Sequence, residues 1–161
     1  MISGLFAALL LAAPWDAPLT MQGIGALRIG MPVAALRRMG ATGENYPDPE
    51  IDCSYWRAPR WPGLAMMVSR DRVVRIETED RRYRTASGAR IGMTEAEIRR
   101  LYGPAMRVEP HHYTGPEGHY LIVRPRRAAY ALLFETDPGT GRATQIRVGT
   151  WEAVQLVEGC S

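Results

Sequence analysis

An internal repeat is the feature that most constrains the fold of this 161-residue chain. Residues 27–39 read LRIGMPVAALRRM and residues 89–101 read ARIGMTEAEIRRL, so an Arg-Ile-Gly-Met element, an alanine and an arginine pair recur at one spacing. The similarity returns downstream, where the apolar segment 66–76 is matched by 132–146 with a longer turn. Self-similarity of this kind predicts two copies of one folding unit.

Each copy is predicted to be a small α+β unit, the first at 22–84 and the second at 85–151, followed by a tail at 152–161. A short helix is expected early in each unit, because apolar residues recur there at helical spacing. Alternation of apolar and polar residues predicts strands, mostly in hairpins, at 53–57, 64–69, 72–78, 106–111, 119–124, 130–136 and 142–148.

The predicted helices run over about 32–39 and 94–102. Thr94, with Glu97 three residues later, has the pattern of a capping box, and Pro32 is of the type favoured in a first helical turn. Helix followed by antiparallel strands, twice, is an α+β architecture in which the helices cover one face of the sheet. No second helical layer is predicted, so we expect the other face to be open, as one continuous surface across the two units.

Two features predict export to the periplasm or the medium. Residues 1–13 are an apolar run that ends in small residues and is too short to span a bilayer, so we assign 1–20 to a signal peptide rather than to a buried helix. Cys53 and Cys160 are the only cysteines, and an even count in an exported chain predicts a disulfide rather than two buried thiols. That bridge would tie down the tail.

The charge pattern argues against a nucleic-acid partner. All 20 basic residues are arginines, and the formal net charge is only +3. Nucleic-acid binders concentrate basic residues on one face or stripe, whereas here acidic residues are interspersed along the chain. The two densest clusters have no recognisable nucleic-acid-binding motif; they comprise Arg81, Arg82 and Arg84, and Arg124, Arg126 and Arg127.

The three histidines, His111, His112 and His119, fall within nine residues of one predicted hairpin. A zinc site needs two or three imidazoles within about 2.0–2.1 Å of the ion, with a carboxylate such as Glu109 or Glu117 as a further ligand. A zinc site, catalytic or carrier, is therefore the alternative function. Because no nucleophile elbow, phosphate loop or other convergent catalytic set is present in the sequence, a non-enzymatic role is favoured.

Aromatic residues are the better guide to function, because exposed Tyr, Trp and Arg anchor protein interfaces. Strand alternation places Tyr55 and Trp56 on opposite faces of a sheet, and about half of the aromatic residues are expected to be core. The candidate contact residues for a protein partner are Tyr55, Trp56, Trp61, His111, His112, Tyr113, His119 and Tyr120.

The repeated Gly-Met-[Pro/Thr]-x-x-Ala-x-[Leu/Ile]-Arg-Arg element before a strand hairpin resembles the tandem α+β repeats of the beta-lactamase inhibitory protein fold and the BamE (SmpA/OmlA) lipoprotein domain. More closely, the chain resembles a group of exported bacterial proteins of unknown function. The matching pieces are Gly25 to Met31, the Pro-His-His-Tyr segment 110–113, Gly-His-Tyr-Leu at 118–121 and Val-Glu-Gly-Cys at 157–160. The resemblance implies a binding module, inhibitor-like or assembly-like, whose partner is another envelope or extracellular protein.

Overall fold

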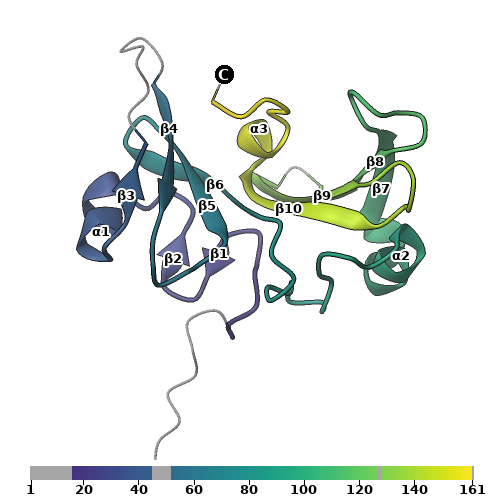
Figure 1. The fold of residues 1–161 in the computed structure, drawn as a ribbon, viewed down its shortest axis with the longest axis horizontal. Helices are drawn as coiled ribbons and strands as arrows, with labels where there is room; N and C mark the ends of the chain where they lie inside the picture. Colours follow the sequence, from purple (N-terminus) through teal and green to yellow (C-terminus); the bar gives the residue numbers. More distant parts are fainter. Residues whose placement is uncertain (1–15, 45–51, 127, 161) are drawn as a thin grey trace, which may run out of the picture.

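The computed structural model describes residues 16–44, 52–126 and 128–160, so most of the predicted signal peptide lies outside the described residues. The architecture is mixed α+β and is dominated by one eight-stranded antiparallel sheet, in the order β3-β4-β5-β6-β10-β9-β8-β7 (Figure 1). Its strands are β3 (Thr42–Gly43), β4 (Cys53–Arg57), β5 (Leu64–Ser69), β6 (Arg72–Thr78), β7 (Met106–Pro110), β8 (His119–Val123), β9 (Tyr130–Thr136) and β10 (Ala143–Thr150). The remaining elements are a small pair, β1 (Gly23–Ile24) and β2 (Leu27–Arg28), and the helices α1 (Val33–Arg38), α2 (Glu95–Tyr102) and α3 (Trp151–Val154), with a 3-10 turn at Gly103–Ala105.

Strands β6 and β10 join the two halves of the sheet at its centre. Glu77 of β6 lies directly opposite Arg147 of β10. Sequence-adjacent residues form the flanking pairs, Ile76 with Val148 and Thr78 with Ile146. The predicted α+β class is therefore confirmed, and the structure shows that the sheet is continuous across the two halves.

Similar backbone hydrogen bonds recur in the two halves. The Gly30 amide donates to the Val73 carbonyl at 2.7 Å, and the Gly92 amide donates to the Ala143 carbonyl at 2.8 Å. In return, the Val73 and Ala143 amides donate to the carbonyls that follow the two glycines, at 2.9 and 2.8 Å. Both glycines have a positive φ, +86° and +88°, a backbone conformation that side-chain-bearing residues rarely adopt.

The start of α2 confirms the predicted capping box. The Thr94 hydroxyl accepts from the Glu97 amide at 3.3 Å, and the Glu97 carboxylate accepts from the Thr94 amide at 2.7 Å. In α1 the expectation for Pro32 was wrong by one position, because Pro32 is the N-cap residue, with extended backbone, rather than part of the first turn.

Thr94→Ala is expected to lower the free energy of unfolding by about 1 kcal/mol at neutral pH, because a helix N-cap is lost. Backbone and side-chain hydrogen bonds from Thr94 hold the pKa of Glu97 below its ordinary 4.5. A pKa lowered by folding stabilises the protein above the unfolded value and ceases to do so as the pH falls through the folded value. Urea unfolding of both proteins should therefore show a difference that narrows below pH 4.5. Thr144→Ala, in an exposed part of β10, is the control and should show no such pH dependence.

One continuous core lies between α1, α2 and the sheet. It contains Leu36 of α1 and Ile98 of α2, packed with residues of β6 and β10 such as Ile76 and Ile146, all fully buried. Because this cluster extends through both halves, α1, α2 and this face of the sheet enclose one hydrophobic core rather than one core in each half.

The opposite face of the sheet is not open, as the sequence had led us to expect. Helix α3 lies over the middle of the sheet (Figure 1), and its Val154 packs with Ile122 and Leu133 of the second half. Ala153, on the next side of the same helix, packs with Met67 of the first half. The apolar residues of this face are covered by the C-terminal segment instead of by a second helical layer, which the sequence pattern could not indicate. None of the helices in the described residues is both long enough and apolar enough to cross a membrane.

Candidate protein-binding face

We call the sheet face that carries α3 and residues 155–160 the tail face. The tail is fastened at its end by the disulfide between Cys53 of β4 and Cys160, which confirms the predicted bridge. Cys160 is buried, and Gly159 lies so close to the Tyr55 hydroxyl that a Cβ there would be only 2.4 Å from it. The tail is therefore covalently closed onto the first half of the sheet and packed against it.

Two buried arginines of the sheet, Arg75 and Arg147, donate hydrogen bonds to the backbone of the C-terminal segment. Arg75 donates to the carbonyls of Ala153 at 2.9 Å and Leu156 at 2.7 Å. Arg147 donates to the same Leu156 carbonyl at 3.3 Å. Carbonyls at a helix end lack intrahelical donors, and these guanidinium groups supply them. Helix α3 is short, so such contacts matter more for its position than helix propensity does.

The charges of these arginines are balanced by neighbouring groups. Arg75 Nε lies 2.7 Å from a carboxylate oxygen of Glu77, and Arg147 pairs with Glu135. Burial lowers the pKa of Arg147, and Glu135 opposes this shift. Burial also raises the pKa of Tyr55, whose hydroxyl oxygen accepts from Arg75 at 2.5 Å. The Arg75 Nε–Glu77 contact is an ion pair without hydrogen-bond geometry, so the hydrogen bonds of Arg75 to Ala153, Leu156 and Tyr55 do most to offset the cost of burying its charge.

The three histidines do not converge. His111 lies on the tail face, where its ring contacts that of Tyr120 in a tilted arrangement with 4.5 Å between ring centroids, and its Nε2 is 3.7 Å from a carboxylate oxygen of Glu135. His119 belongs to the opposite side, where its Nδ1 is 2.7 Å from a carboxylate oxygen of Glu95 in α2. The described part of the chain contains no group of three His, Cys, Asp or Glu side chains placed to hold a metal ion. His111 and His119, which the zinc alternative brings together, therefore lie on opposite sides of the sheet.

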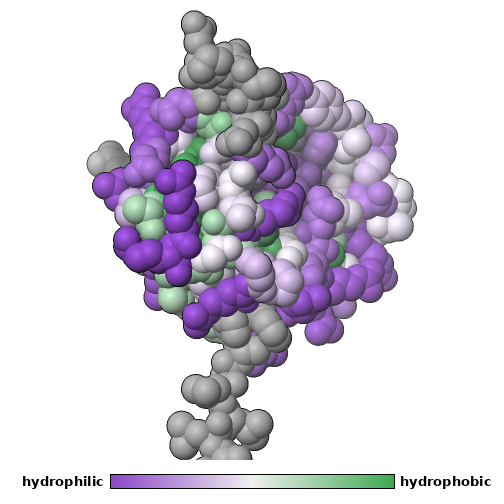
Figure 2. Space-filling model, turned by 60° about the vertical axis from the view of Figure 1, so that its left-hand side comes forward, coloured by the Kyte–Doolittle hydropathy of each residue, from purple (hydrophilic) through white to green (hydrophobic). Residues whose placement is uncertain are grey.

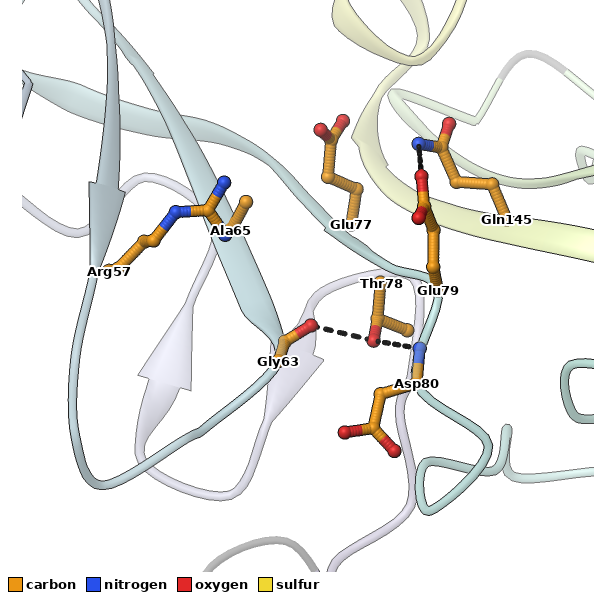
Figure 3. Close-up of a pocket in the computed structure, with 8 residues that line it drawn as sticks. All are labelled: Arg57, Gly63, Ala65, Glu77, Thr78, Glu79, Asp80 and Gln145. Atoms are coloured by element: carbon orange, nitrogen blue, oxygen red, sulfur yellow. Dashed lines mark hydrogen bonds between the residues drawn. The ribbon is translucent and has the colours of Figure 1, made fainter.

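A pocket of about 410 Å³ lies beside the junction of β6 and β10 (Figure 3). It is lined by Arg57, Gly63, Ala65, Glu77, Thr78, Glu79, Asp80 and Gln145. The Thr78 hydroxyl donates to the Gly63 carbonyl at 2.8 Å and accepts from the Asp80 amide at 3.0 Å. These two hydrogen bonds hold together three of the residues that line the pocket. Two of its three carboxylates are already paired with arginines, Glu77 with Arg75 at 2.7 Å and Asp80 with Arg82 at 2.9 Å, so the pocket carries little uncompensated negative charge.

A second hollow separates the loop between β7 and β8 from the tail. This tail groove, of about 390 Å³, is lined by His112, Tyr113, Leu156, Val157, Glu158 and Gly159. The Tyr113 hydroxyl donates to a Glu158 carboxylate oxygen, and this hydrogen bond raises the pKa of Tyr113. Tyr113 is 60% exposed and Leu156 is 47% exposed. Among the described residues, only Leu101, on α2, is another large hydrophobic residue exposed to this degree.

A third hollow on the tail face lies beside Trp151, a residue that was not among the predicted contact residues. Arg124 lies over its ring, with the guanidinium carbon 4.3 Å from the ring centroid, and Arg107 approaches at 5.8 Å. The adjoining pocket, of about 140 Å³, is lined by Glu109, Tyr120, Ile122, Leu133, Arg147, Trp151 and Gln155. Its proximity to Tyr120 depends on long-range strand order, so no local sequence signal marks it.

The predicted contact residues divide by burial. Trp56, Trp61 and Tyr120 are buried, so these three side chains offer a partner little surface in the folded chain. Tyr55, His111 and His119 are half-buried, and His112 and Tyr113 are exposed. Trp56 and Tyr55 do lie on opposite faces, as strand alternation predicted. The two exposed candidates, His112 and Tyr113, both line the tail groove.

On the side that Figure 2 shows, hydrophilic residues and residues of intermediate hydropathy cover most of the described surface, and hydrophobic residues are visible only in small areas between them. The described surface in this view therefore has no large contiguous apolar patch of the kind that marks an interface.

Comparison with known proteins identifies a fold but no family. No protein-family model matches the chain, and no curated protein matches it significantly. The uncharacterized protein yfeY from Escherichia coli is similar in structure, with a TM-score of 0.52, 12% identity, and coverage of 83% of this chain and 99% of that one. A cysteine-rich secretory protein from Staphylococcus aureus has a TM-score of 0.49 and 12% identity, and 87% of this chain matches 49% of that chain. At these identities the likeness to yfeY shows the fold alone.

Proposed function

We propose that this chain is a non-enzymatic binding module that docks on another envelope or extracellular protein through the tail groove. The observation that carries the proposal is the exposure of Tyr113 and Leu156 on the two sides of one groove. Tyrosine is among the residues that contribute most to binding at interfaces. The disulfide and the guanidinium contacts from Arg75 and Arg147 fix the tail before binding, so little ordering entropy is lost on association.

We further propose that the sheet consists of two copies of one α+β unit, 22–84 and 85–151, as in the inhibitory-protein and BamE folds that the sequence resembles. The matching hydrogen bonds of Gly30 and Gly92 support this proposal. The Glu77–Arg147 pair supports it as well, because equivalent positions of the two units are expected to face each other across a local two-fold axis.

Export to the periplasm or the medium forms part of the proposal. The disulfide between Cys53 and Cys160 fits an oxidising compartment. The apolar run at the start of the sequence is proposed to be the export signal.

The test is capture from the periplasmic and secreted fractions of the source bacterium, followed by calorimetry with the purified partner. The oxidised protein and Leu101→Ala should retain the same protein at one-to-one stoichiometry. The double variant Tyr113→Ala/Leu156→Ala should bind it at least about 30-fold more weakly, as expected for the loss of an interface anchor.

Leu101→Ala is the matched control, because it removes a similarly exposed hydrophobic side chain from α2 instead of from the groove. Equal affinity of the double variant and the parent protein would contradict the proposed surface. Failure of the parent protein to retain any protein from either fraction would contradict the proposed function.

A further inference from the structure

A cluster of arginines surrounds a pocket at the end of β10 that is remote from α3. The pocket, of about 400 Å³, is lined by Arg81, Arg90, Ile91, Gly92, Met93, Glu97 and Arg142. Two of the three arginines come from the connection between β6 and α2, and the third immediately precedes β10. None of these residues lines the tail groove, so the pocket is separate from the proposed protein-binding surface.

Two of the guanidinium groups are brought together at one glycine. Arg142 Nη1 donates to the Gly92 carbonyl at 2.8 Å. The Arg81 guanidinium lies against the other side of the residue, because a Cβ at Gly92 would be 3.3 Å from Arg81 Cζ. The absence of a side chain at Gly92 therefore permits both its positive φ and the close approach of Arg81. Arg90, two residues earlier, completes the set.

The positive charge of this cluster is only partly compensated. In the described ranges, no ion pair is formed by Arg81, Arg90 or Arg142. The one carboxylate on the pocket wall is that of Glu97, whose Oε2 already accepts from the Thr94 amide at 2.7 Å and hydroxyl at 2.8 Å. The Glu97 carboxylate also attracts Arg142, which helps to lower the pKa of Glu97, so three guanidinium groups share one carboxylate and a bound anion would reduce their remaining repulsion.

The first half of the chain offers a natural comparison. Arg28 and Arg72 occupy the positions that correspond to Arg90 and Arg142, and Arg72 Nη1 likewise donates to the Gly30 carbonyl, at 3.0 Å. The offset of 62 residues that relates Arg28 to Arg90 would pair Arg81 with Leu19, which is buried, and both residues precede their units. The third guanidinium group is therefore contributed by the connection between β6 and α2, and the first half has no arginine at the corresponding position.

We propose that the Arg81–Arg90–Arg142 pocket binds a phosphate-bearing anion, either a free phosphate compound or the headgroup of an anionic lipid. The planar guanidinium fork matches phosphate oxygens with two parallel hydrogen bonds, and several arginines around one pocket multiply this match. Ile91 and Met93 on the same wall provide apolar contact for the group that the phosphate carries. This site is independent of the proposed function.

The test measures binding of inorganic phosphate by calorimetry at low ionic strength, with chloride at matched ionic strength as the reference. A second arm measures flotation of the protein with phosphatidylcholine vesicles made with and without phosphatidylglycerol. Arg81→Gln is the principal variant, because no hydrogen bond of the described residues depends on its side chain and the fold should be preserved. Arg90→Gln/Arg142→Gln is compared with Arg28→Gln/Arg72→Gln, which removes the same charge and an equivalent bond to a glycine carbonyl.

We expect saturable binding of phosphate or of phosphatidylglycerol vesicles by the parent protein and by R28Q/R72Q. Both R81Q and R90Q/R142Q should weaken it by about tenfold or more. Arg81-dependent flotation would identify a lipid headgroup as the source of the phosphate, whereas calorimetric binding without flotation would identify a soluble compound. The absence of both signals, or equal losses in the two double variants, would overturn the proposal.

Discussion

Cys160→Ser is expected to lower the free energy of unfolding by about 4–5 kcal/mol, the loop-closure entropy of a bridge that encloses on the order of a hundred residues. The bridge joins residues 107 positions apart, so it restricts most of the unfolded chain. An apparent Tm lower by roughly 10–20 °C should accompany this loss. Urea unfolding of the oxidised protein and of the variant, at one pH and without reductant, measures the difference.

The same loss should appear in Cys53→Ser and in the double variant, because each of the three proteins lacks the same cross-link. The parent protein unfolded in the presence of a dithiol reductant should match them. A loss below about 1 kcal/mol in the single variants would show that the tail contacts, not the cross-link, dominate stability, contrary to the chain-entropy account.

The parts of the fold that could be predicted from sequence depend on local patterns. Strands β5 and β6 begin and end at the predicted residues, because apolar alternation is interrupted by Arg70 and Asp71, which both adopt a positive φ in the turn. The capping box at Thr94 is equally local. Such features require only the spacing of neighbouring residues, which the sequence displays directly.

The parts that could not be predicted depend on partners distant in the chain. Trp61 follows a strand and looks available for contact, yet it is 1% exposed because the core under the helices closes over it. His111 and His119 are neighbours in the sequence but lie on opposite sides of the sheet. The groove between Tyr113 and Leu156 exists only because the tail returns to the sheet. These arrangements follow from strand order and tail docking, which local periodicity does not encode.

Arg75→Met is expected to destabilise the protein by about 3–5 kcal/mol, because it removes one partner of a buried ion pair. The Glu77 carboxylate then lacks its counter-charge, and two backbone carbonyls lack a hydrogen-bond donor. The side chain of Arg75 is 2% exposed, and besides Glu77 it binds the carbonyls of Ala153 and Leu156. Its loss should also loosen the tail, so that the disulfide is reduced faster by a dithiol. Urea unfolding and the rate of disulfide reduction are the two measurements.

Arg107→Met is the matched control, because Arg107 also pairs with a carboxylate two residues along its strand, at 3.1 Å, but is largely exposed. An exposed pair contributes about 0–1 kcal/mol, so this variant should unfold and be reduced almost like the parent. Arg75→Met/Glu77→Gln should recover part of the stability lost in Arg75→Met, because the uncompensated carboxylate is then gone. It should not restore slow reduction, because the carbonyls of Ala153 and Leu156 still lack their donor. Equal stability of Arg75→Met and Arg107→Met would mean that Arg75 does not hold the tail in place.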